Sequence, residues 1–375
     1  MNKKRKSDWL IKVAPVLAVL IVLLKLAFPF YTTPTSSMDK TLIVGDVVLV
    51  NRCSYGYRIP FSATRLHAFQ KVNRNDVIVF NFPCGDTIIA ERPELSYYDQ
   101  VRQAEYELKN THDTATGPRE KLTDDGYHIQ TNAIYNRDAY LKRCKAIAGD
   151  KVEIKDGILF VNDKIADEAS TDYLPYVVHF GDSLQISEDY MRNFEKIYGS
   201  EYLGEATHNY FNLRLTSENA AKARELKEVR SINPFIFPAG NKMFPVANIF
   251  PNNFKYYTWN IDNMGPIIIP KKGMALQLND STLCQYQRLI TVYEGNKLEQ
   301  NAGKIYINGK ETTEYTCKMD YYWVMGDNRH NSLDSRFWGF LPEDHLIGRA
   351  TSVLFNTNNS LSTQEKTSRI FKKVD

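Results

Sequence analysis

The apolar residues at the start of the chain form one continuous run, whereas those of the rest of the chain come in short groups. Four basic residues at 3–6 precede Trp9, and a mostly apolar stretch then continues to Phe30. A membrane-spanning helix needs about 20 mostly apolar residues, so the pattern predicts a basic segment at 1–8 and one transmembrane helix at 9–30. A cleaved signal sequence would show a similar run, but no small-x-small cleavage site follows it.

The charges beside this run predict its orientation. Lysine and arginine next to a spanning helix stay in the cytoplasm, so everything after Tyr31 is expected on the other side of the membrane. The run is therefore predicted to be a single-pass anchor that makes membrane lipid a partner of the chain.

Beyond the anchor, β-branched and aromatic residues recur in short runs that turn-forming residues separate. Four of these runs are predicted to be strands, at 47–50, 77–80, 151–154 and 158–161. The sequence Lys-Asp-Gly at 155–157 is typical of a hairpin turn between the last two. We therefore expect a mainly β fold with an antiparallel β-core.

Two stretches depart from this pattern, and we interpret them as insertions on the β scaffold. Residues 86–137 are polar, rich in tyrosine and irregular, and residues 188–230 are charged and contain helix-favouring segments. The predicted organisation after the anchor is a catalytic β-core at 31–165 with an insertion at 86–137, a large inserted cap region at 166–319, the return of the β-core at 320–356, and a C-terminal tail at 357–375.

The composition narrows the class of function. The chain has 375 residues, of which 43% are hydrophobic and 24% charged, with a formal net charge of +3. These values are ordinary for a globular protein, and the small charge argues against nucleic acid as a partner. Five cysteines without CxxC spacing and seven histidines without an HExxH motif predict no metal site and no disulfide scaffold.

Two segments contain residues that could act as a nucleophile and a base. Ser36 and Ser37 follow a proline and a threonine soon after the apolar run. Serine in such a place is usually an ordinary loop residue, and it becomes a nucleophile only when a base removes its proton.

Lys142 is the candidate base. Strand alternation places it on one face with Tyr140 and Cys144, while Arg143 and Lys145 point to the other face. A free lysine has a pKa near 10.4 and is protonated at neutral pH, but burial among apolar groups lowers that pKa. A structural lysine held in a salt bridge is the alternative interpretation of this segment.

A third segment, residues 325–336, reads MGDNRHNSLDSR and lies between aromatic runs at 321–324 and 337–340. So many acidic, basic and amide side chains together are costly to bury, and they are typical of a functional site.

The three segments, in this order, resemble the conserved boxes of the type I signal peptidases. The resemblance covers the anchor, 35–52, 76–80, 140–152 and 321–350, and its most specific part is the pattern GDNRxNSxDSRxWGxxP at 326–342. The segment 265–273 and the large insertions also resemble the longer signal peptidases of the Bacteroidetes type.

The resemblance implies a role for each matching residue. Ser37 matches the nucleophile and Lys142 the general base of a Ser–Lys dyad. Thr35 matches a hydroxyl of the oxyanion hole, to which the Ser37 backbone N–H would also contribute, and Ser332 matches the serine that orients the lysine. Other matching positions form a supporting polar network (Arg143, Asp327, Asp334 and Arg336) and substrate pockets (Met38, Leu42, Tyr140 and Leu141).

Three positions depart from the family pattern. Ser36 stands where a glycine is frequent, Lys40 replaces a proline, and Ala148 replaces another proline. None of them matches a reacting group, so the departures concern the local shape of the backbone.

The function that the resemblance implies is that of a serine endopeptidase that removes N-terminal signal peptides from exported preproteins, without cofactor or metal. It implies a single-pass protein of the bacterial inner membrane, with its catalytic domain on the periplasmic side. A catalytically inactive, membrane-tethered binding protein on the same fold is the alternative. A self-cleaving repressor would instead carry a cytosolic DNA-binding domain at its N-terminus.

Overall fold

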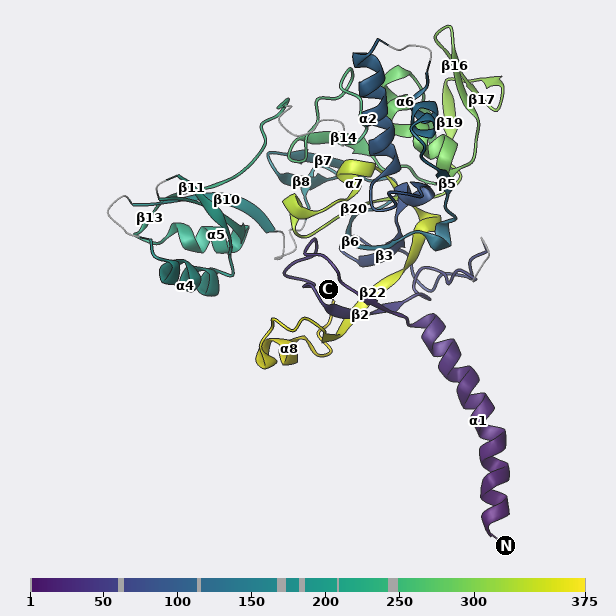
Figure 1. The fold of residues 1–375 in the computed structure, drawn as a ribbon, viewed down its shortest axis with the longest axis vertical. Coiled ribbons are helices and arrows are strands. Elements are labelled where there is room, and N and C mark those ends of the chain that lie inside the picture. The colour runs from purple at the N-terminus through teal and green to yellow at the C-terminus, as the bar shows by residue number, and fades with distance from the viewer. Residues whose placement is uncertain are drawn as a thin grey trace.

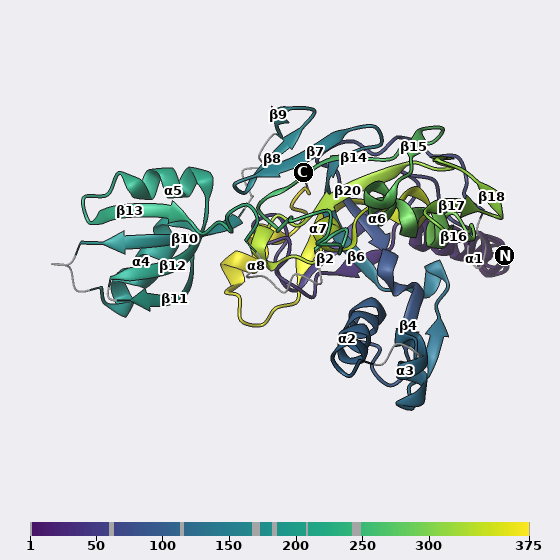
Figure 2. The same cartoon turned by 90° about the horizontal axis from the view of Figure 1, so that it is seen from above.

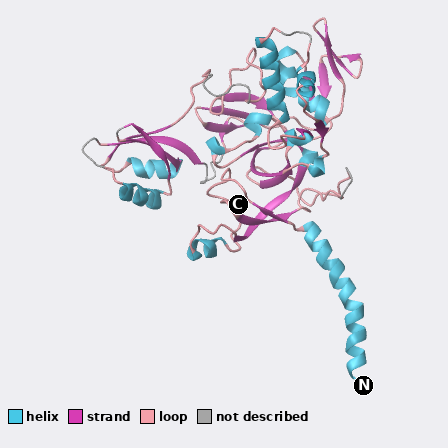
Figure 3. Ribbon diagram, in the orientation of Figure 1, coloured by secondary structure: helices cyan, strands magenta, loops and turns pink. Residues whose placement is uncertain are grey.

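The computed structural model describes residues 2–59, 64–112, 116–166, 173–181, 186–207, 209–241 and 249–374, with the side chains described from residue 13 onward. Strands dominate the body of the molecule, and a long helix projects from it (Figures 1 and 3). A lobe of strands and helices stands to one side of the body, and a second group of helices lies on another side (Figure 2).

The body is built on a seven-stranded antiparallel sheet. Its order is β1-β2-β22-β3-β6-β20-β21. The bounds are β1 Phe30–Thr32, β2 Asp46–Asn51, β22 Leu346–Asn356, β3 Val77–Asn81, β6 Ala139–Ala146, β20 Tyr321–Met325 and β21 Leu341–Pro342. Every residue of β3 is buried, as expected for an apolar strand in the middle of a sheet. The prediction of a mainly β, antiparallel core is therefore confirmed.

A second antiparallel sheet packs beside the first. Its order is β14-β7-β8-β9, with bounds β14 Met264–Ile268, β7 Lys151–Lys155, β8 Ile158–Val161 and β9 Lys164–Ile165. The predicted hairpin between β7 and β8 is confirmed, and its turn residues Asp156 and Gly157 both have positive φ, which favours this tight turn. Ile154 of this sheet and Trp323 of the first share one hydrophobic core, so the two sheets form a single body.

Several short elements complete the body. They are the strand pair β15 Ala275–Gln277 and β19 Glu314–Thr316, the three strands β16 Leu298–Asn301, β17 Lys304–Ile307 and β18 Lys310–Glu311, the helices α6 Asp280–Arg288, α7 Ser335–Trp338 and α8 Thr363–Arg369, and a π-helical turn η4 Leu289–Tyr293. Leu276, Leu283 and Tyr315 belong to the same core as the second sheet, so this part of the chain packs against the body.

The lobe has a hydrophobic core of its own. It consists of a four-stranded sheet in the order β11-β12-β10-β13 with two helices. The bounds are β10 Tyr173–Phe180, β11 Glu201–Thr207, β12 Tyr210–Thr216, β13 Val229–Pro234, α4 Glu188–Tyr198 and α5 Ser217–Arg224. Phe180, Phe194 and Leu213 meet in its core. The residues 166–319 of the predicted cap region therefore form two parts, which are this lobe and a later stretch of chain that packs into the body.

The insertion at 86–137 is more regular than the sequence suggested. It contains β4 Thr87–Ile89, α2 Tyr97–Asn110, α3 Pro118–Asp124 and β5 Ile129–Thr131. Ser96 caps α2 by accepting a hydrogen bond from the Asp99 N–H, and Tyr97, Ala104 and Leu108 form its buried face. These apolar positions are spaced by seven and four residues, a helical period that the surrounding polar residues obscure.

The projecting helix α1 spans Asn2–Ala27. Its large apolar side chains from Val16 to Leu24 are between 46% and 68% exposed. Within the described residues, we find no helix with both the length and the apolar character needed to cross a membrane. The transmembrane helix predicted at 9–30 also ends early, because α1 stops at Ala27 and Phe30 already pairs with β2; the side chains of residues 9–12 lie outside the described ones.

Candidate active site

The loop that carries Ser37 connects β1 and β2 and is clamped from two sides. Within the loop, the Asp39 N–H donates to Ser36 O (3.0 Å). From outside, Asn328 donates its backbone N–H to Ser37 O (3.1 Å) and its side-chain amide to Ser36 O (3.1 Å). Asn331 adds a hydrogen bond to the Ser36 hydroxyl (2.8 Å). Ser37 is thus held at a fixed position, with its side chain mostly buried.

Lys142 reaches this serine from the central strand β6, where it lies opposite Ile78 of β3. Its Nζ is 2.7 Å from Ser37 Oγ and 3.1 Å from Leu141 O. The lysine is 5% exposed. Burial lowers its pKa to about 8, although the carboxylates of Asp334 and Asp327 act in the opposite direction. An amine with this pKa is partly neutral near neutral pH and can accept a proton.

The strand alternation predicted for β6 agrees with the packing. Tyr140 and Cys144 belong to one hydrophobic cluster, whereas Leu141 packs against another. The Lys142 Nζ lies 5.8 Å from the centre of the Tyr140 ring. An apolar strand face therefore supplies the environment that lowers the lysine pKa.

Thr35 lies beside the nucleophile but outside the buried part of the site. It is exposed, and its hydroxyl donates to Ser37 Oγ over 3.4 Å, which is long for a hydrogen bond between hydroxyl groups. Such a weakly held hydroxyl is free to turn toward another acceptor close to Ser37.

Ser332 is brought to the site, but it does not form the hydrogen bond expected of it. Its hydroxyl makes no bond to Lys142 among the described residues, and it lies close to Asp334. Burial raises the pKa of Asp334, yet Arg336 and the Gly326 N–H bring it below its ordinary value. A Cβ on Gly326 would lie 2.3 Å from Ser332 Oγ and 2.5 Å from Ser37 O, so only glycine permits this close approach. The orienting role of Ser332 stays a prediction.

Asp327 forms a buried ion pair with Arg143 that joins three segments. Arg143 donates from Nε and from one terminal nitrogen to the two carboxylate oxygens of Asp327, each over 2.8 Å. Thr41, in the nucleophile loop, donates to the same carboxylate (2.6 Å) and accepts from Arg143 (2.9 Å). Burial raises the pKa of Asp327, but the hydrogen bond and charge of Arg143 outweigh it and lower that pKa.

A second buried ion pair lies on the other side of the lysine. Asp334 and Arg336 are both fully buried and are joined at 2.8 Å and 2.9 Å. Asp334 also accepts from the Gly326 N–H (3.1 Å) and caps α7, and Arg336 donates to Arg329 O. All four residues predicted to form the supporting network therefore lie around Ser37 and Lys142.

The residues predicted to line substrate pockets fall into two groups. Met38 and Leu42 are almost fully buried and pack with Val48 in the core under the nucleophile loop. Tyr140 and Leu141 are only partly buried. The structure thus gives Met38 and Leu42 a packing role, and their contact with substrate stays a prediction.

Lys40 is a site contact that the sequence did not indicate. Its backbone φ is +78°. Its ammonium group donates a hydrogen bond to Gly199 O in the lobe, and the same nitrogen lies 4.3 Å from the centre of the Tyr173 ring. Proline fixes φ near −65°, so the proline that the family has at this position could not adopt the backbone conformation found at Lys40. Asn328 and Asn331, which clamp the serine loop, also had no assigned role, although both lie in the recognised segment at 325–336.

Metal-binding groups are not gathered at this site. Among the described residues, no three side chains of histidine, cysteine, aspartate or glutamate are grouped as metal ligands would be.

The sequence is similar to known proteins over most of its length. The model of the family described as "Signal peptidase, peptidase S26" matches residues 6–221 and 312–355, which include every site residue discussed above. A signal peptidase I of Haemophilus influenzae is 23% identical over 348 residues, covering 92% of this chain and 69% of that protein. One from Buchnera aphidicola is 22% identical over 361 residues, covering 94% and 76%. One from Aquifex aeolicus is 46% identical over 43 residues, covering 12% and 17%.

The buried ion pair of Asp327 generates a prediction about stability. Asp327→Ala leaves the Arg143 charge buried without its carboxylate, which should lower the free energy of unfolding by about 3–5 kcal/mol. Chemical denaturation of the purified protein measures this change.

The matched control is Asp189→Ala, which removes the same side chain from an exposed pair with Arg192. Its effect should stay below about 1 kcal/mol. Equal losses in the two variants would contradict the importance given to the buried pair.

Proposed function

This chain belongs to the signal peptidase family, peptidase S26, and is thus a serine peptidase; we propose that it removes N-terminal signal peptides from exported preproteins, with Ser37 as nucleophile and Lys142 as general base. The observation that carries the dyad is the 2.7 Å distance between Lys142 Nζ and Ser37 Oγ inside a buried site. The lowered pKa of Lys142 supports the same assignment, because a base has to be unprotonated.

In the proposed reaction, the neutral amine of Lys142 takes the proton of the Ser37 hydroxyl while the oxygen attacks the carbonyl carbon before the cut. The resulting tetrahedral intermediate collapses when Lys142 gives that proton to the leaving amine, which is the new N-terminus of the mature protein. Water then attacks the acyl-enzyme with Lys142 again as base, and the signal peptide leaves as a carboxylate. Every proton transfer is thus made by one residue.

The negative oxygen of the intermediate needs hydrogen-bond donors, and two groups are suitably placed. Among the described residues, the Ser37 backbone N–H donates no hydrogen bond within the protein. The Thr35 hydroxyl makes only its long contact to Ser37 Oγ. We assign both to the oxyanion hole, where loss of one donor typically costs about 3–4 kcal/mol of transition-state stabilisation.

The assignment of substrate-binding residues follows from family membership and from the partly buried side chains next to the dyad. Tyr140 and Leu141 directly precede Lys142 on β6 and are the predicted pocket residues that remain accessible. Both are assigned to substrate binding, and the family prefers small side chains in the residues before the cut.

We further propose that α1 attaches the protein to the bacterial inner membrane, with the body on the periplasmic side. The exposed apolar side chains between Val16 and Leu24 support this assignment, since such a surface is unfavourable in water. The basic residues at 3–6 support the orientation.

The first test of the proposal is Ser37→Ala. The variant should fold normally but lose cleavage of a purified preprotein, because no other group replaces the attacking oxygen. Gel analysis with N-terminal sequencing of the product measures this loss. The matched control Ser360→Ala, at an exposed position, should cleave like the wild type. Wild-type cleavage by Ser37→Ala would refute the nucleophile assignment and would favour a different active centre.

The second test concerns Lys142 and pH. Because the lysine acts as a base only when neutral, kcat/KM should rise with pH below about 8 and level off above it. Lys142→Arg should be inactive, since a guanidinium keeps its proton, while Lys155→Arg, at a 60% exposed lysine, should be unchanged. Activity in Lys142→Arg, or a profile that still rises up to the ordinary lysine pKa near 10.4, would be inconsistent with this role.

The third test concerns the membrane. The full chain expressed in bacteria should remain in the membrane fraction after an alkaline carbonate wash, and a chain that begins at residue 28 should be released by it. Protease added to spheroplasts should degrade the body of the full chain. Release of the full chain by carbonate would contradict an anchoring role for α1.

A further inference from the structure

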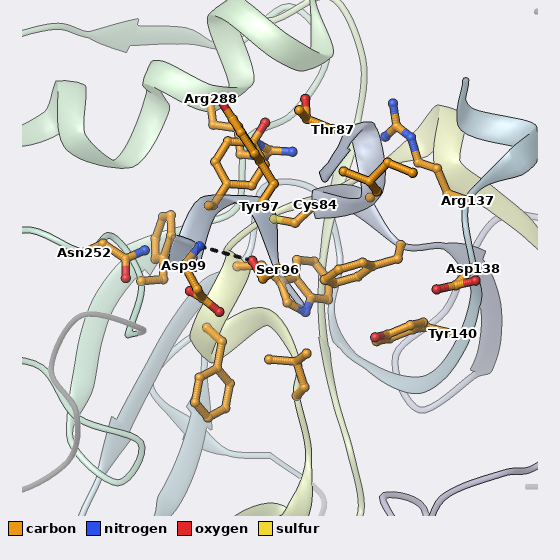
Figure 4. A pocket seen from close by; sticks show the side chains of 18 of the residues that line it. Cys84, Thr87, Ser96, Tyr97, Asp99, Arg137, Asp138, Tyr140, Asn252 and Arg288 are labelled. Atoms are coloured by element: carbon orange, nitrogen blue, oxygen red, sulfur yellow. Dashed lines mark hydrogen bonds between the residues drawn. The ribbon is translucent and has the colours of Figure 1, made fainter. Parts of the chain in front are cut away.

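A cavity of about 520 Å³ lies beside the proposed active site and has no assigned role. It lies between the insertion, the central sheet and α6, and Figure 4 shows Tyr97 and Arg288 on one side of it and Tyr140 with Asp138 on another. Its volume is within the range of about 300–1,000 Å³ typical of ligand-binding pockets. The cavity is thus large enough to hold a segment of a peptide.

The walls of the cavity are rich in aromatic side chains. Phe82 stacks on Tyr140 with ring centres 4.5 Å apart, and Phe337, Trp338 and Phe340 also line the space. A surface of this kind binds apolar side chains. The insertion and α6 complete the cavity, so it depends on parts of the chain outside the β-core of the dyad.

The charged groups of the cavity differ in whether they have partners. Arg288 donates to Asp86 and to Tyr293, and Arg137 donates to backbone oxygens. The carboxylates of Glu94 and Asp138 are exposed and form no ion pair among the described residues. The described lining residues without an ion-pair partner thus include Arg137 as well as these two carboxylates, so the cavity carries charge of both signs.

Two residues of the cavity wall lie next to the proposed active site. Tyr140 lines it and has its ring centre 5.8 Å from Lys142 Nζ. Leu333 also lines it, directly follows Ser332 and is 46% exposed. The cavity is therefore close enough to the dyad to be considered as a site for residues of the same bound peptide.

The position of α1 indicates which part of a preprotein reaches this cavity. Helices α2 and α6, which wall it, lie at the end of the body away from α1 (Figure 1). The apolar part of a signal peptide belongs at the membrane, near α1, so the chain that leads away from the membrane is the part after the cut.

We propose that this cavity is a binding subsite for the first part of the mature protein, and that it takes an apolar or aromatic side chain located after the cut. The proposal rests on the signal peptidase function proposed above. It assigns the insertion at 86–137 a role in substrate selection, because Tyr97 and Leu95 contribute to the cavity wall.

The test uses two synthetic substrates with the same residues before the cut. After the cut, one carries a short segment with phenylalanine and leucine, and the other carries only glycine and serine. The wild-type enzyme should cleave the first with a kcat/KM about tenfold or more above that of the second, as expected for a side chain gained by an apolar pocket.

Leu95→Lys places an ammonium in the cavity from a side chain that is 47% exposed, so folding should be preserved. It should remove most of the preference for the first substrate while leaving cleavage of the second unchanged. The matched control is Tyr106→Lys on α2, at a 63% exposed residue outside the cavity lining, which should keep the preference. Ile88→Trp, which fills the cavity from β4, provides a second variant with the same expected loss.

The possible outcomes separate this proposal from the proposed function. Equal cleavage of both substrates by the wild type, or a preference that survives both cavity variants, overturns the mature-side subsite while leaving the peptidase function intact. Variants that respond only to changes before the cut would assign the cavity to the signal peptide and also overturn the proposal. Failure of the wild type to cleave any preprotein would instead refute the function itself.

Discussion

Asp327 is the residue on which the arrangement of the active site depends most. Its carboxylate, buried completely, binds Arg143 of β6 and Thr41 of the serine loop, and its own backbone follows β20. Three segments far apart in the sequence therefore meet at one charge. A buried carboxylate is tolerated only when its partners are complete, so folding that satisfies Asp327 also brings Ser37 and Lys142 within reach of each other.

The same ion pairs govern the electrostatics around the lysine. The carboxylates of Asp327 and Asp334 both stabilise the protonated form of Lys142 and thereby act to raise its pKa. Each of them is bound to an arginine, Arg143 or Arg336, and the charge of Arg336 acts against their influence on the lysine. Burial can then dominate, and the amine loses its proton more readily. The buried charges thus stabilise the fold while the lysine next to them stays close to electrically neutral surroundings.

The sequence alone predicted the features that depend on residues close together in the chain. The period of two along β6 placed Lys142 with Tyr140, and the hairpin between β7 and β8 followed from its turn residues. Helix α2 was missed because its few apolar positions are separated by polar and tyrosine residues. The burial of Lys145, which is 2% exposed, was also not foreseen. Strand alternation predicts the direction in which a side chain points, but not which other part of the chain covers that face of the strand.

Lys40 illustrates why the remaining contacts could not be predicted from the sequence. Its partner Gly199 is 159 positions away. At φ +78° the Lys40 backbone has a conformation that proline cannot adopt, and its side chain reaches the lobe. The lobe is also held near this loop by Tyr173, whose backbone N–H donates to Asp327 O. A shift of the lobe would therefore act directly on the backbone three residues after Ser37.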